Sequence, residues 1–122
     1  MDVLASELNL TISEFSHEGH RRRVNYGFAK LATLHQMAGP IFVFAHIVSP
    51  HPPFVFEADG QPHNPEEDYY LGDGDDYQGD LDEYLAGYTA QVEFVNRQVE
   101  QMAASILANS DMPPIIILQG DH

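Results

Sequence analysis

The sequence predicts an α/β fold built around a parallel βαβ unit. Two apolar segments of strand length, residues 41–48 and 115–118, are rich in β-branched residues. Such apolar runs, the first interrupted only by His46, are typical of strands that are buried on both faces of a parallel sheet. Between them, residues 85–107 carry apolar side chains at steps of three and four, which indicates an amphipathic helix. A strand–helix–strand crossover is right-handed in nearly all cases, so the two strands are expected to be parallel.

The chain order of the other elements follows from local patterns. A first helix is predicted from Val24 to the Gly39-Pro40 stop, because apolar residues recur every three to four positions. Residues 1–23 before it are predicted to be an irregular lead-in, so the domain proper would span residues 24–122. The three arginines that end the lead-in, Arg21 to Arg23, are expected to form a solvated helix start.

The second helix is predicted to end near Asn109-Ser110, and its polar side is expected to include Gln91. The first strand must end at Ser49, because three prolines follow within four residues. His46 lies inside this strand and is expected to be a hydrogen-bonded core histidine.

Composition excludes several classes of function. Nineteen acidic residues against five basic ones give a formal net charge of −14, which disfavours nucleic acid and anionic membrane surfaces as partners. No apolar run is long enough to span a bilayer, and the first 15 residues do not resemble a signal peptide, so no membrane contact by this segment is expected. The absence of cysteine excludes disulfides, thiolate metal ligands and a cysteine nucleophile.

A long irregular acidic stretch, residues 57–83, stands between the first predicted strand and the second helix. Its DGDD sequence suggests oxygen ligands for a hard cation, but the spacing of an EF-hand loop is not met. Asp73, Asp75 and Asp76 are therefore expected to be solvated. Long loops in compact domains often carry function. This leaves open a non-catalytic acidic α/β module that binds a cation or a partner protein through residues 57–83.

Candidate metal ligands stand at the predicted strand tips. His51 follows the first strand, and Asp121 and His122 follow the second. In open α/β sheets, ligands bind beyond the carboxyl ends of the strands, so these three residues are expected at one edge. A carboxylate beside an imidazole is a good ligand pair for zinc or manganese. The alternative is that the Asp-His pair is a frayed polar end.

Three motifs in this order resemble the sulfatase-like branch of the alkaline phosphatase superfamily. They are GPIFVFAHIVSPHPPFVFEADG at residues 39–60, YLAGYTAQVEFVNRQV at 84–99 and PPIIILQGDH at 113–122. The likeness is greatest to bacterial membrane-anchored sulfatase-like proteins, and more distant to lipoteichoic acid synthases and phosphoethanolamine transferases. It covers roughly residues 24–122.

The resemblance implies a partial three-layer sandwich excised from a large, mostly parallel sheet. It implies an enzyme that hydrolyses or transfers sulfate or phosphate esters with divalent metal (Mn, Zn, Ca or Mg), on the extracytoplasmic face of a bacterial membrane. By position, Asp121 and His122 match the metal-binding pair, and His51 in PHPPF matches the histidine that contacts the ester oxygens. The family's nucleophile has no match here, so this chain would be an inactive fragment with no catalytic residue of its own.

The sequence also bears on the oligomeric state and on a structural role. A sheet cut from its neighbours exposes strand edges and apolar helix faces, so the chain is expected to form a homo-oligomer. A short natural protein with a purely structural role also remains open.

Overall fold

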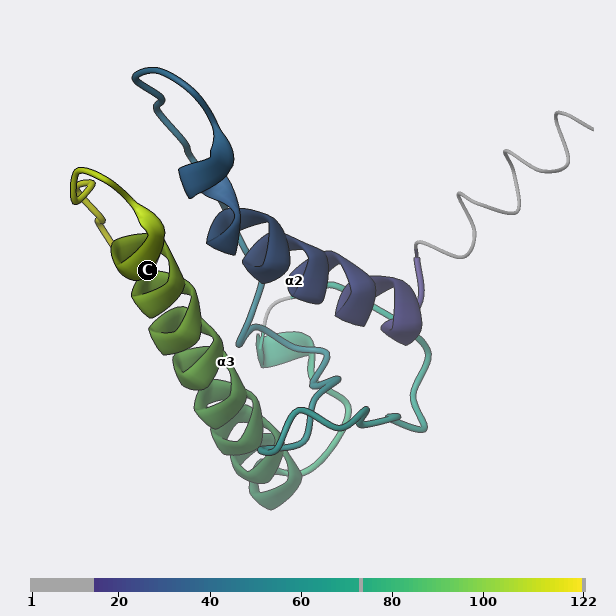
Figure 1. Cartoon of the computed structure of the whole chain (residues 1–122). Helices are drawn as coiled ribbons and strands as arrows, with labels where there is room; N and C mark the ends of the chain where they lie inside the picture. The colour runs from purple at the N-terminus through teal and green to yellow at the C-terminus, as the bar shows by residue number, and fades with distance from the viewer. Residues whose placement is uncertain (1–14, 73, 122) are drawn as a thin grey trace, which may run out of the picture.

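The computed structural model describes residues 15–72 and 74–121, and its regular structure is helical. The elements are α2 (His17–Ala32), the 3₁₀ turns η1 (Leu34–Gln36) and η2 (Gly74–Asp76), and α3 (Leu81–Asn109). The only β feature in those ranges is an isolated antiparallel bridge between Phe56 and Pro62. Figure 1 shows α2 and α3 inclined to each other, with the chain after residue 49 passing between them. No helix in the described part is both long and apolar enough to cross a bilayer.

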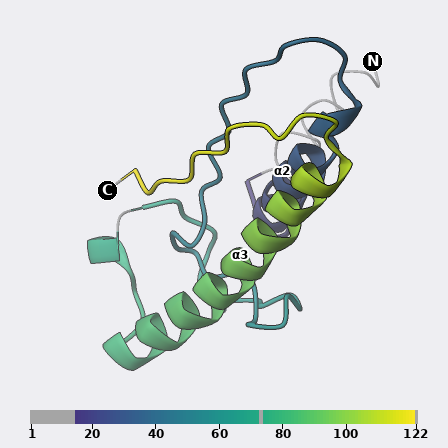
Figure 2. The same cartoon turned by 60° about the vertical axis from the view of Figure 1, so that its left-hand side comes forward.

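The predicted α/β fold with a parallel βαβ unit is therefore wrong. Residues 41–48 and 115–118 are extended but not paired, and Figure 2 shows their traces running in different directions. Their side chains are exposed rather than buried: Phe42 by 93%, Phe44 by 83%, Ile115 by 92% and Ile117 by 78%. A run of apolar residues indicates only that burial is favourable. A β-strand also needs a neighbouring strand to hydrogen-bond with its backbone amides and carbonyls. A pair of strands alone is marginal, and the described chain offers no third.

The long second helix is confirmed, and it begins one turn earlier than predicted. Asp80 caps the helix by accepting a hydrogen bond from the amide of Glu83, and the Glu83 side chain accepts one from the amide of Asp80. This reciprocal capping box satisfies two amides that the first turn leaves without partners. The helix therefore begins at Leu81, inside the stretch that was predicted to be irregular, and it ends at Asn109.

The first helix begins at His17 and ends at Ala32, so it starts within the predicted irregular lead-in. The Ser16 hydroxyl accepts a hydrogen bond from the amide of Gly19, which fixes the start. Leu34 and Met37 continue the apolar spacing, but they lie in and after the 3₁₀ turn η1 rather than in α2.

The core forms where residues 54–56 insert between the two helices. Phe56 stacks on Phe94 of α3 with ring centroids 4.0 Å apart, and Val55 is fully buried. The buried core cluster consists of Val24, Phe28, Val55, Phe56, Phe94, Met102 and Ile106. A short extended segment, rather than a sheet, therefore supplies the centre of the core.

Two buried polar side chains hold this insertion in place. Arg21 of α2 donates hydrogen bonds from Nη1 to the carbonyls of Val55 and His63, and from Nη2 to the side-chain oxygen of Asn64. Arg21 is buried, so its prediction as part of a solvated cluster is wrong, whereas Arg22 is exposed.

Gln91 of α3 is the second buried polar side chain and is fully enclosed. Its Oε1 accepts from the amide of Val55 at 2.8 Å, and its Nε2 donates to the carbonyls of Pro50 and His51. The prediction that Gln91 lies on the polar face of its helix is therefore wrong. Both helices are joined to one connecting segment through its backbone.

We predict that Arg21→Met lowers the free energy of unfolding by about 2–3 kcal/mol, because it removes the side-chain donors to the carbonyls of Val55 and His63 and to the side chain of Asn64. Methionine keeps the apolar stem, so the loss reports the hydrogen bonds rather than the packing. Urea unfolding followed by circular dichroism measures it. Lys30→Met, at an exposed position of the same helix, is the control and is expected to change stability by less than about 0.5 kcal/mol. Equal effects for both variants would contradict the role of Arg21.

Candidate functional site

His51 lies in a turn, residues 49–53, whose backbone is hydrogen-bonded to a side chain of α3. The side-chain amide of Gln91 donates to the carbonyls of Pro50 and His51 at 3.2 and 3.1 Å. These two hydrogen bonds fix the backbone on both sides of the His51 Cα. The Ser49–Pro50 and Pro52–Pro53 peptide bonds are cis. The position of His51 is therefore set by a buried side chain 40 residues further along the chain.

The imidazole of His51 has a defined tautomer. Its Nδ1 lies 2.5 Å from the carbonyl oxygen of Pro52. A carbonyl can only accept a hydrogen bond, so Nδ1 carries the proton and donates it. Within the described residues no hydrogen bond engages Nε2 of His51. That nitrogen is a lone-pair donor in the neutral ring and a hydrogen-bond donor to an anion in the charged ring.

Asp121 lies against the first apolar segment. Its Oδ2 is 3.4 Å from Nε2 of His46, and both side chains are more than half exposed. His46 is therefore not the core histidine that the sequence predicted. The sheet edge that was expected to gather His51 and Asp121 does not form in the described ranges, but Asp121 still reaches the segment that leads into His51. The third predicted residue, His122, lies outside the described residues.

The described residues contain no complete metal site. No group of three or more His, Cys, Asp or Glu side chains among them is arranged to hold a metal ion. This applies to Asp121 with its neighbours and to Asp75 and Asp76 in the acidic stretch. Asp73, the third acid of that stretch, lies outside the described residues. His46 and Asp121 offer two donors of the type that borderline divalent metals accept.

Sequence reasoning missed His20, which lies close to the His51 turn. His20 is only 2% exposed, and burial, together with nearby Arg23, lowers its pKa from 6.5 to about 4. The Tyr69 hydroxyl lies 3.4 Å from its Nδ1, and Arg23 donates to the same hydroxyl at 2.9 Å. The missed signal was spacing, because His20 precedes Val24 and Phe28 at steps of four and so belongs to the buried stripe of α2.

Two buried polar atoms lie where α2 packs against the turn that carries His51. Nε2 of His20 and Oγ of Ser49 are both buried without a hydrogen bond of normal geometry within the described residues. The backbone of Val48 and the ring of His51 are near enough to influence the pKa of His20. The turn that carries His51 is therefore packed against α2 as well as against α3.

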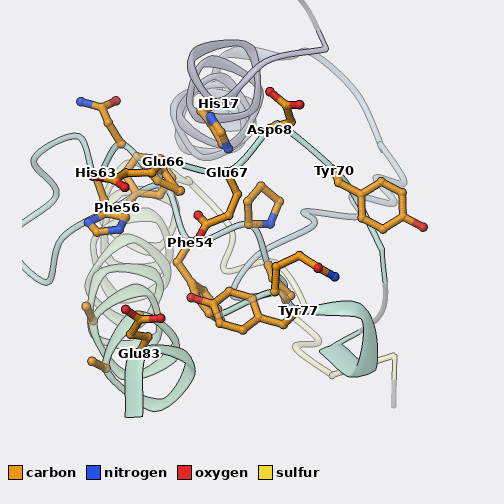
Figure 3. A pocket seen from close by; sticks show the side chains of 18 of the residues that line it. His17, Phe54, Phe56, His63, Glu66, Glu67, Asp68, Tyr70, Tyr77 and Glu83 are labelled. Carbon is orange, nitrogen blue, oxygen red and sulfur yellow. The ribbon is translucent and has the colours of Figure 1, made fainter. Parts of the chain in front are cut away.

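A separate pocket of about 440 Å³ opens on the other side of the inserted segment (Figure 3). Its floor is apolar and aromatic, with Phe54 packed against Tyr77 at a centroid distance of 5.7 Å. The pocket is lined by six carboxylates, those of Glu57, Glu66, Glu67, Asp68, Asp76 and Glu83. No lysine or arginine is among its described lining residues.

The pocket is electrostatically negative. Burial raises the pKa of Tyr77, and the carboxylates of Glu67, Glu83 and Asp80 raise it further. Figure 3 shows Glu67 reaching into the pocket between His17 and Phe54. The buried Nε2 of His17 has no hydrogen-bond partner there among the described residues, and burial lowers the pKa of this histidine. A second lining histidine, His63, places its Nδ1 2.7 Å from Oε1 of Glu57, so one of the six acids has a histidine partner.

Comparison of the chain with protein-family models, with curated proteins and with solved structures finds no match. The chemistry of both sites therefore rests on their own residues.

We predict that His20 makes the fold sensitive to acid. The pKa of His20 is lower in the folded chain, so the unfolded chain binds the extra proton between pH 6.5 and about 4. Stability is unaffected by His20 above pH 6.5 and falls by roughly 2–3 kcal/mol as the pH drops toward 4. His20→Gln removes this part of the pH dependence in urea unfolding from pH 7 to pH 4. His35→Gln, a half-buried control in the 3₁₀ turn η1 that follows α2, leaves it in place. An unchanged pH dependence in His20→Gln would contradict the assignment.

Proposed function

We propose that this chain is a piece of a metal-dependent enzyme that hydrolyses or transfers sulfate or phosphate esters. Asp121 and His122 are its metal ligands, and His51 contacts the ester oxygens. The observation that carries the proposal is the 3.4 Å approach of Asp121 to His46. It brings Asp121 against the segment that leads into PHPPF, and the sequence resemblance joins the motifs that contain these residues.

Asp121, His51 and Gln91 have different roles in the proposed site. Asp121 is exposed and anionic, which suits a metal ligand that completes its coordination with other groups. His51 keeps Nδ1 on the Pro52 carbonyl, so Nε2 is oriented to donate a hydrogen bond to an ester oxygen when the ring is charged. A divalent metal supplies stabilisation of the charge on the transferred group and lowers the pKa of a nucleophile. Gln91 positions His51 by holding the backbone on which it stands.

The proposal assigns no nucleophile to residues 1–122. Two donors, His46 and Asp121, meet in the described structure, and a metal centre of this kind needs more. We therefore propose that the nucleophile and the other ligands come from the rest of a longer enzyme. By resemblance, that enzyme lies on the extracytoplasmic face of a bacterial membrane. This chain alone is expected to bind metal weakly and to leave aryl sulfates and aryl phosphates intact.

Manganese binding tests the assignment of Asp121. Titration of the chain with MnCl₂, followed by calorimetry or by water-proton relaxation, is expected to show a weak site that Asp121→Asn weakens tenfold or more, because the substitution removes a charged ligand. The double variant Asp75→Asn/Asp76→Asn is the control, since it removes two negative charges from the acidic stretch and spares Asp121. If the control weakens binding and Asp121→Asn does not, the metal belongs to the acidic stretch and the proposal is wrong.

The pocket favours a second candidate function, the binding of a cationic group of a partner. A cavity of about 440 Å³ with an aromatic floor and six carboxylates is complementary to an arginine or lysine side chain. This candidate retains the acidic stretch as a binding element, now on a helical scaffold.

A basic peptide tests this second candidate. Fluorescence anisotropy with an arginine-containing peptide is expected to show binding that salt weakens, because the attraction is between exposed charges. Glu67→Gln is expected to weaken it several-fold, since Glu67 projects into the pocket. Glu100→Gln, an exposed acid on α3 away from the pocket lining, is the matched control. Equal effects of the two variants would show attraction by net charge and would exclude a specific role for the pocket.

A further inference from the structure

Two extended segments present an unused hydrogen-bonding backbone. We call residues 41–46 and 115–120 the open segments. Within the described structure, none of their backbone amides or carbonyls takes part in a backbone–backbone hydrogen bond. Unpaired extended backbone is a template on which another extended chain can pair. The unpaired backbone groups of the open segments therefore favour binding of another polypeptide segment in the β conformation.

Most of the large apolar side chains of the open segments are also exposed to solvent. Phe42, Phe44 and Ile115 are more than four-fifths exposed, whereas Ile116 packs against the core. Ile115 and Ile117 thus point away from the core on either side of an inward residue, as successive residues of a strand do. A large aromatic side chain covers roughly 150–250 Å², so the apolar side chains of the open segments together offer on the order of 800 Å² per copy. A stable dimer needs roughly that area from each partner.

Charge indicates where two copies of this molecule can meet. With a net charge of −14, two copies repel each other over most of their surface. The sequence holds no Asp, Glu, Lys or Arg between residues 31 and 56, nor between residues 112 and 120. These two stretches contain the open segments, so contact there brings no acids directly into opposition.

We infer that the chain forms a two-fold symmetric dimer in which the open segments of two copies pair as antiparallel β-strands. The same segment pairs with itself about the axis, so the contact is closed and uses one surface of each copy. The pairing satisfies backbone groups that water satisfies in the single chain, and it covers Phe42 and Phe44. The inference does not rest on the proposed chemistry, but the two share His46, which lies in an open segment and approaches Asp121.

Sedimentation velocity and infrared spectroscopy over a concentration series test the dimer together. In the single chain the only described β feature is one bridge, so a β-sheet amide I band that grows with the dimer fraction reports the pairing directly. Phe42→Glu/Phe44→Glu is expected to shift the dissociation constant at least a hundredfold toward monomer and to abolish the band. Both side chains are exposed in the single chain, so the variant is expected to fold.

Tyr26→Glu is the control, because it places one negative charge on another exposed aromatic residue, which lies on α2 and is 68% exposed. It is expected to retain both the dimer and the band. Phe44→Pro removes one backbone donor and is expected to weaken the dimer without adding charge. A monomer at every concentration, a dimer without the β band, an open-ended series of larger species, or equal loss in Tyr26→Glu and the double variant would each overturn the inference.

Discussion

The fold depends on the attachment of residues 54–56 to both helices at once. Phe56 and Val55 fill the space between α2 and α3, but apolar packing alone does not fix which way an extended segment faces. Arg21 and Gln91 fix it, because one bonds the carbonyl of Val55 and the other bonds its amide. The amide of this fully buried residue is thereby satisfied by a side chain. Its carbonyl accepts from Arg21 and also from the backbone amide of His63, next to the antiparallel bridge between Phe56 and Pro62. The two helices are held together by a segment that takes the place a sheet would otherwise occupy.

The same attachment positions the groups proposed for function. Gln91 bonds the backbone of Pro50 and His51 as well as that of Val55, so the turn that presents His51 belongs to the rigid part of the molecule. Asp121 lies at the end of an extended segment of which only Ile116 packs against the core. The two halves of the proposed site therefore differ in how firmly they are held.

The extent to which the sequence predicts this structure varies by element. The apolar stripe of α3 is long and regular, so its existence and its end were predictable, while the capping box at Asp80 and Glu83 was overlooked. Arg21 and Gln91 were misassigned because their partners lie 34–43 residues away, and polarity alone does not reveal a long-range backbone contact. The apolar runs at 41–48 and 115–118 were wrongly predicted to be buried strands, because periodicity carries no information on whether pairing strands are present, and most of their large side chains are exposed. The pocket was unpredictable for a related reason, since its lining comes from segments that only the fold brings together.

Amide hydrogen exchange on dilute, monomeric chain tests the central claim, that a segment pinned by side chains replaces a sheet. The account predicts slow exchange at Val55, whose amide is bonded to the buried Gln91 side chain, and fast exchange throughout residues 41–46 and 115–118. Gln91→Leu is expected to abolish the protection at Val55. Protection of residues 41–46 in the monomer, with Val55 indifferent to Gln91→Leu, would show a paired sheet and contradict the account.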